Sequence, residues 1–239
     1  MTGVVLIHVA GVVKHYNALR PLRLQDWRLA SGQTVALRGF DKVAAEVLVN
    51  LLTGSSLPDE GVVRVFGRAT SEISTSDDWL ESLRRFALLS ERTVLVEQLT
   101  VEQNLAIPHT LVVDPIPPDV RQIARAVGEE LDLTELMASP AQGLSAFDLA
   151  RVRLGRVLAL SPELLLAEHP TAGLDRDEAA RFGRLTATVV KRRGLAAVYL
   201  TADDEFARIV GREVLALRPA TGELSSTSGW RQWFKKGSS

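Results

Sequence analysis

The stretch from Val35 to Gly54, VALRGFDKVAAEVLVNLLTG, has the outline of a loop that binds phosphate. A strand-like apolar run ends at Gly39, and a helix-like run closes on Gly54. Such a loop uses glycines to curve backbone N–H groups around the phosphate, a lysine to neutralise its charge, and a hydroxyl to hold Mg²⁺. Here the interval reads FDKVAAE, which lacks those residue types at those places. The outline of the site is present, and the residues that would do its chemistry are not.

Other residue types that do chemistry give weaker patterns. The four histidines show no metal-ligand spacing, and the absence of cysteine excludes disulfides and thiolate metal sites. The run KRRG at 191–194 is more typical of a helix C-terminus than of a nucleic-acid patch. The pairs at 77–78 and 203–204 read as carboxylates at helix starts rather than as an acid–base pair. No independent catalytic constellation emerges from these residues.

The elements expected around the loop alternate between strands and helices. Strands are predicted in 4–16, in 22–39 with a tight turn at 31–33, and in 62–67, 86–91, 163–168, 195–202 and 213–217, the last taken as the final strand. Helices are predicted in 44–52, 77–85, 100–107, 119–131, 145–159, 177–193 and 205–210. Thr100 with Gln103 has the capping-box pattern, Ser145 is a candidate N-cap, and Gly194 is a candidate C-cap. This alternation favours a partly parallel sheet covered on both faces.

Composition sets the class of protein. The chain has 239 residues, 46% hydrophobic and 24% charged, which suits one large domain or a domain with an insert. Its net charge of −1 gives no electrostatic case for nucleic-acid binding. The first residues read as a strand rather than a signal peptide, and no apolar run approaches the ~20 residues of a membrane helix. We therefore expect a cytoplasmic protein.

Four stretches in one register carry a resemblance to a known family. They are the frame at 39–54, LPDEGVVRVFG at 57–67, LTVEQNLAIP at 99–108, and LSAFDLARVRLGRVLALSPELLLAEHPTAGLD at 144–175. Over essentially its whole length the chain resembles the ATPase subunit, or nucleotide-binding domain, of ABC transporters. The resemblance implies an α/β, P-loop NTPase-like ABC ATPase fold with an N-terminal antiparallel β subdomain and a helical insert. It implies one domain over 1–239, with an approximate insert at 77–144 and a C-terminal tail at 225–239.

The phosphate-binding positions depart from the family pattern. The family lysine falls on Ala45 and the Mg²⁺-binding Ser/Thr on Glu46. Non-glycine residues resist the required curve, and Glu46 is expected to put a carboxylate in the first helical turn, where a phosphate would lie. Lys42 lies three positions early as a substitute for the missing lysine. The degenerate loop comprises Gly39, Phe40, Asp41, Lys42, Val43, Ala44, Ala45 and Glu46, and Tyr16 stands at the adenine-stacking position.

The positions that hydrolyse ATP in the family are also changed. The metal-orienting Asp falls on Glu168, the general-base Glu on His169, the switch His on Ala202 and the Q-loop Gln on Glu91. A neutral imidazole can accept a proton, but alanine cannot contact a phosphate, and an ionised glutamate offers no amide donor. We expect none of these four to be catalytic, and His169 to be structural. We accordingly expect no bound cofactor or metal, with ATP and Mg²⁺ only if the family site is still used.

The motifs that serve the opposite subunit in the family are partly kept. The signature LSGGQ becomes Leu144, Ser145, Ala146, Phe147 and Asp148. Side chains at the two glycine positions are expected to block backbone approach to a γ-phosphate, and Asp148 to repel it. The D-loop keeps Gly173, Leu174 and Asp175, which in the family pack across the dimer.

Three functions follow from this pattern. The first is a non-catalytic subunit that supports ATP-driven transport, with an ABC permease and another ATPase subunit, identical or different, as partners and no nucleic acid. Such a subunit would sit peripherally at the inner face of a membrane through the permease. The second is an active ATPase with an atypical site that uses Lys42, Glu168 and His169. The third is a soluble regulator or scaffold, whose tail GWRQWFKK at 229–236 contacts a partner or an anionic membrane. The residues favour the first.

Overall fold

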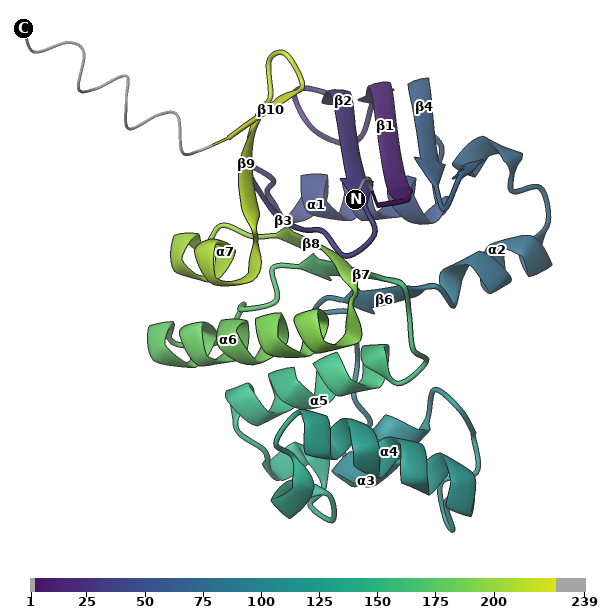
Figure 1. The fold of residues 1–239 in the computed structure, drawn as a ribbon, viewed down its shortest axis with the longest axis vertical. Helices are drawn as coiled ribbons and strands as arrows, with labels where there is room; N and C mark the ends of the chain where they lie inside the picture. The colour runs from purple at the N-terminus through teal and green to yellow at the C-terminus, as the bar shows by residue number, and fades with distance from the viewer. Residues whose placement is uncertain (1–2, 227–239) are drawn as a thin grey trace, which may run out of the picture.

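The computed structural model describes residues 3–226 and arranges them around two β-sheets (Figure 1). The strands are β1 (Val5–Lys14), β2 (Leu22–Ala30), β3 (Thr34–Arg38), β4 (Glu60–Val65), β5 (Arg68–Ala69), β6 (Phe86–Leu89), β7 (Leu164–Glu168), β8 (Ala196–Leu200), β9 (Glu213–Arg218) and β10 (Glu223–Ser226). The helices are α1 (Lys42–Thr53), α2 (Ser76–Leu83), α3 (Val101–Ala106), α4 (Pro118–Glu130), α5 (Ala146–Leu158), α6 (Arg176–Arg193) and α7 (Asp204–Val210). Short 3₁₀ turns lie at Thr70–Glu72, Thr134–Leu136 and Ala141–Gly143.

The smaller sheet is antiparallel and has the strand order β2-β1-β4-β5. Alternating apolar residues of β1 and β2 turn inward, as a half-buried strand requires. Asp59 ties the end of β1 to the turn before β4, because its carboxylate accepts from the His15 backbone N–H at 2.6 Å and from Lys14 Nζ at 2.9 Å. These hydrogen bonds, the backbone one first, lower the pKa of Asp59 to about 2. The sheet is the antiparallel β subdomain that the resemblance implies.

The larger sheet has the order β10-β9-β3-β8-β7-β6, and its strands from β9 to β6 run parallel. Because side chains alternate along a strand, each central strand supplies two cores. Leu164 and Leu166 of β7 join α1 and the small sheet in one core, whereas Leu165 joins the helices on the other face. Figure 1 shows α1 between the two sheets, with α5 and α6 beneath the larger one. The expected parallel sheet covered on both faces is confirmed.

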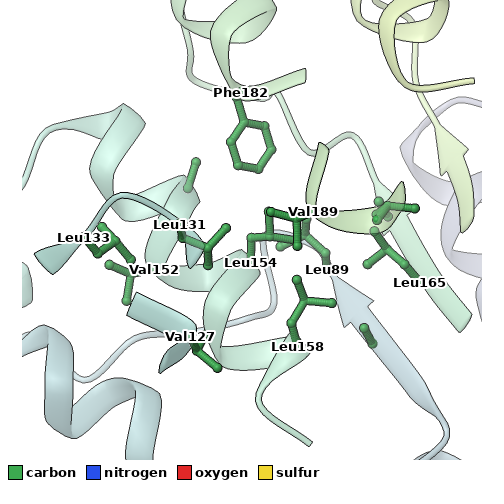
Figure 2. Packing of buried hydrophobic residues seen from close by; sticks show 14 of the residues in the cluster. Leu89, Val127, Leu131, Leu133, Val152, Leu154, Leu158, Leu165, Phe182 and Val189 are labelled. Atoms are coloured by element: carbon green, nitrogen blue, oxygen red, sulfur yellow. The ribbon is translucent and has the colours of Figure 1, made fainter. Parts of the chain in front are cut away.

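The second core extends from the sheet into the helices farthest from the small sheet. Leu154 of α5, with Phe182 and Val189 of α6, is fully or almost fully buried there (Figure 2). Gly155 brings α5 close to α3 and α4, since a Cβ at this position would lie 2.7 Å from Leu105 Cδ2 and 2.9 Å from Leu131 Cδ1. Strand β6 lies within 77–144 and pairs with β7 in the larger sheet. We propose that the helical insert is the part of 77–144 that follows β6.

Three details differ from the sequence prediction or fall beyond it. Strands β2 and β3 flank the turn at 31–33 but belong to different sheets, so this turn links the two sheets instead of closing a hairpin. Strand β9 is not the last, because β10 returns antiparallel beside it. Of the tail at 225–239, the first two residues are in β10, and 227–239 lie outside the described residues. No helix in residues 3–226 is long and apolar enough to span a membrane.

Candidate functional site

A cavity of about 730 Å³ opens at the carboxyl ends of the parallel strands β6, β7 and β8, beside the start of α1. Parallel α/β sheets commonly bind ligands at this edge. The cavity brings together Lys42, Glu46, Glu91, Glu168, His169 and Ala202, together with Arg92, Thr171, Thr201 and Asp203. Positions widely separated in the sequence therefore line one cavity. Neither Tyr16 nor Gly39 lines this cavity.

Helix α1 begins two residues earlier than the sequence prediction, at Lys42. Asp41 is its N-cap, and its Oδ1 accepts from the Ala44 backbone N–H at 2.8 Å. The first turn of a helix carries free N–H groups that bind anions. A capping carboxylate accepts a hydrogen bond from one of these N–H groups and interacts favourably with the positive end of the helix dipole. The expectation that Glu46 lies in the first turn is wrong, because the earlier start of the helix puts Glu46 in the second turn. The carboxylate at the start of the helix is that of Asp41.

Gly39 adopts a φ of +84° at the end of β3, a conformation that a side chain resists. A Cβ there would also lie 3.2 Å from the Leu217 carbonyl oxygen. The chain therefore needs glycine at this position to leave the sheet, whatever the loop after it binds.

Two cations pair with three of the carboxylates of the cavity. Arg92 donates from Nη1 to Glu46 Oε1 and from Nη2 to Glu168 Oε1, both at 2.6 Å. Lys42 Nζ is paired with Glu91 and holds the pKa of that carboxyl below its usual range. Burial raises the pKa of Glu168, and Arg92 opposes that rise. No group of three or more histidine and carboxylate side chains within residues 3–226 is arranged to hold a metal ion.

Arg92 is a charged cavity residue that the sequence analysis missed. It follows Glu91 directly, and its carboxylate partners lie 46 and 76 residues away in the chain. The available signal was indirect: two glutamates at positions that the family fills with a hydroxyl and an aspartate require an extra positive charge. Pairing over such distances depends on the tertiary fold, so no local pattern identifies it.

His169 follows β7 with a φ of +43°, which is strained for a residue with a side chain. Its backbone N–H donates to the Leu200 carbonyl at 2.8 Å, which fixes the chain between β7 and β8. Its Nε2 is buried and has no hydrogen-bond partner within residues 3–226. His169 lines both the main cavity and a smaller one of about 230 Å³, which Ala146, Gly173 and Leu174 also line.

Tyr16 packs against the core beneath the small sheet and is partly buried. Burial raises the pKa of its phenol, and the nearby Asp41 carboxylate adds to the rise. The interaction with Asp41, the N-cap of α1, places Tyr16 on the same side of the molecule as the start of that helix.

The signature segment is held by hydrogen bonds within its own chain. Ser145 caps α5, donates to Asp148 Oδ2 at 2.7 Å, and accepts from the Asp148 N–H at 3.1 Å, while Arg151 is paired with Asp148. The expectation that the Phe147 side chain blocks approach from outside is wrong, because this ring is only 9% exposed. It lies against the guanidinium of Arg181, 4.4 Å from the ring centroid, and that of Arg151, at 5.0 Å. Ala146 is the exposed residue of the two.

The D-loop residues lead directly into α6. Gly173 has a φ of +83° with open space around it, and Leu174 packs partly against the larger core. Asp175 is the N-cap of α6 and forms a capping box with Glu178, accepting from its N–H at 2.8 Å. Local capping fixes the end of the D-loop at Asp175.

A family model described as ABC transporter matches residues 22–172, which is well over half of the chain. The chain belongs to the ABC transporter family. Its fold is the α/β fold of the ABC ATPases with an antiparallel β subdomain. The dimeric post-hydrolysis structure of the ATP-binding cassette MJ0796 bound to ADP and Pi superposes with a TM-score of 0.72 at 20% identity, covering 92% of this chain and 98% of that one. At that identity the likeness is one of fold.

Two relatives show how this ABC protein compares in sequence and length. Cholesterol transporter ABCA5 of Homo sapiens is 27% identical over 173 residues, which cover 71% of this chain and 10% of that protein. The sulfate/thiosulfate import ATP-binding protein CysA of Pseudomonas syringae is 27% identical over 227 residues, covering 93% of this chain and 68% of CysA. The chain therefore spans about a tenth of the length of the first relative and corresponds to an ATP-binding domain.

Proposed function

We propose that this chain is a non-catalytic ATP-binding-cassette subunit. It supports ATP-driven transport through a permease and a partner ATPase subunit that binds and hydrolyses ATP in its own site. The proposal combines the family's role in transport with a cavity whose charged groups are already satisfied by one another.

One observation carries this proposal: the start of α1 is occupied by its own capping carboxylate. Asp41 Oδ1 lies 2.8 Å from the Ala44 backbone nitrogen, at the helix end that would face a phosphate. A phosphate at this end would have to displace that hydrogen bond and approach the carboxylate of Asp41. The residues present therefore do not fit a nucleotide phosphate held in the family manner.

The side chains around α1 support the same reading. Glu46 stands at the metal-binding hydroxyl position and is paired with Arg92, and Lys42 is paired with Glu91. Ala202 and Ala45 offer no hydrogen bond to a phosphate. Loss of one donor or charge at a catalytic site commonly costs ~10²-fold or more in rate, and several such groups are absent together here.

Partner contacts are proposed for two surfaces. The insert has a cavity of about 640 Å³ lined by residues of α3 and α4, and the nearby Leu111 is 92% and Val112 58% exposed. Exposed apolar side chains beside a hollow are typical of a docking site, and we assign this surface to the permease. The D-loop at 173–175 is assigned to a second ATPase subunit, identical or different. Through the permease the chain would lie at the inner face of a membrane.

An active ATPase with an atypical site is the second candidate, because of His169. Its buried Nε2 has no hydrogen-bond partner among the described residues, and the side chain lines the main cavity together with Glu168. The regulator hypothesis rests on the tail at 229–236, which lies outside the described residues.

A hydrolysis assay distinguishes the non-catalytic subunit from the active ATPase with an atypical site. We expect the purified chain and its His169→Ala variant to release phosphate from ATP with Mg²⁺ at the same background rate, because His169 has no positioned nucleotide to act on. Phosphate release by the natural chain that His169→Ala abolishes would establish the atypical ATPase instead. Ser161→Ala, at an exposed position away from the cavity, serves as the matched control for handling of a variant.

A further inference from the structure

The main cavity contains a bridge between three elements that meet only in the folded chain. Glu46 comes from α1, Glu168 from the end of β7, and Arg92 from the loop after β6. Each of the two terminal nitrogens of Arg92 holds a different carboxylate, and both N···O distances are 2.6 Å. The Glu168 side chain is only 12% exposed, so one end of the bridge lies within the protein.

The two carboxylates stand where the family resemblance places the ligands of a metal ion. In that pattern a neutral hydroxyl and one aspartate share the cation with the phosphates of the nucleotide. Replacing the hydroxyl by Glu46 adds a negative charge opposite Glu168, and two facing carboxylates need a cation between them. A guanidinium suits this role because its planar fork presents N–H groups in two directions and never loses its charge.

Lys42, the other cation that lines the cavity, does not pair with Glu46 or Glu168, and the Asp203 carboxylate is also engaged elsewhere. Lys42 is engaged with Glu91, and the Asp203 carboxylate caps α7 by accepting from the Glu205 and Phe206 N–H groups. A bound metal ion has to be supplied from solution, whereas the guanidinium is part of the chain and already pairs with both carboxylates. The bridge is therefore complete without any ligand.

We propose that Arg92 is a covalently attached substitute for the divalent cation, holding α1 and β7 together at the position the family gives to Mg²⁺. The inference rests on the proposed function only in treating that position as unused by nucleotide. It goes further because it names Arg92 as the residue that holds α1 and β7 together in place of a metal ion. It applies to the chain without any nucleotide.

The proposal is tested by thermal unfolding of the full chain with and without millimolar Mg²⁺ or Mn²⁺, nucleotide-free. We expect the natural chain to unfold at the same temperature in both conditions. Arg92→Gln should lower the midpoint by about 4–8 °C, because it leaves two facing carboxylates unpaired, one of them mostly buried. Divalent cations should then raise the midpoint of this variant again, since the freed carboxylates are oxygen ligands of the kind that Mg²⁺ and Mn²⁺ bind.

Two further variants make the cation response specific. Arg92→Gln combined with Glu46→Gln should show no response to divalent cations, because one of the two carboxylates is gone. Arg84→Gln, which removes an exposed arginine outside the cavity, should behave like the natural chain. If Arg92→Gln does not fold, Arg92→Lys is measured in its place. This variant keeps the positive charge but not the planar fork, so its unfolding midpoint should fall less and should rise less with divalent cations.

Each remaining result overturns the proposal. They are stabilisation of the natural chain by divalent cations, an Arg92→Gln variant as stable as the natural chain, and a destabilised variant that no divalent cation restores. None of these results measures ATP, so each leaves the proposed function standing; ATP hydrolysis by the natural chain would remove the proposed function through a separate assay.

Discussion

Replacing Phe182 by alanine is expected to lower the free energy of unfolding by about 3–5 kcal/mol. Phe182 is fully buried on α6 and stacks on Phe206 of α7 with ring centroids 6.4 Å apart. Figure 2 shows its ring pointing into the core that Leu154 and Val189 also fill. The truncation removes a whole ring from a close-packed interior, and surrounding side chains fill such a space only in part. Because the D-loop ends at Asp175, the N-cap of α6, the loss would also loosen the D-loop.

Equilibrium denaturation followed by circular dichroism measures this effect. Arg184→Ala is the matched control, since Arg184 lies on the exposed face of the same helix, and its change should stay within about 0.5 kcal/mol. A loss below about 1 kcal/mol for Phe182→Ala would mean that the core around α6 is packed less tightly than described.

Gly61→Ala is the second change with a large expected effect. Gly61 is the second residue of β4 and has a φ of +81°, and a Cβ there would lie 2.3 Å from the Gly11 carbonyl oxygen. A backbone atom cannot rotate away as a side chain can, so the small sheet would have to shift. We expect a loss of about 2–5 kcal/mol, combining the strain of a left-handed alanine with the overpacking.

Gly67→Ala separates the two causes of that loss. Gly67 has nearly the same φ, +83°, but nothing lies within 4 Å of the added Cβ. This control should cost only the conformational strain, about 1–2 kcal/mol. Equal losses for the two variants in denaturation experiments would show that the crowding at Gly61 contributes nothing.

Local signals predicted much of the fold. The capping box of Thr100 and Gln103 is formed, with Thr100 Oγ1 3.2 Å from the Gln103 nitrogen, and Ser145 and Gly194 cap their helices as expected. These predictions succeed because a cap depends on residues within one turn of each other. The Asp41 cap is equally local, because Asp41 accepts a hydrogen bond from the N–H of Ala44, three residues later. The same pattern could therefore have predicted it from the sequence.

The rest of the candidate site depends on contacts between distant segments. Family spacing placed Glu46, Glu91, Glu168 and His169, and one cavity brings them together. It could not place Arg92, whose partners come from two other elements. Nor could it show that Phe147 turns inward, because that orientation depends on Arg181 of the neighbouring helix α6. Charge pairing and side-chain direction are decided by the tertiary fold.

Calorimetric titration of ATP with Mg²⁺ into the purified chain tests our proposal that the chain does not bind ATP. The matched control is the double variant Ala45→Lys and Glu46→Ser, which restores the lysine and the hydroxyl of the family loop. We predict no binding heat from the natural chain, and heat from the double variant alone would tie the loss to these two positions. Saturable, Mg²⁺-dependent heat from the natural chain would contradict this proposal, because it would mean that a phosphate reaches the start of α1 despite the Asp41 cap.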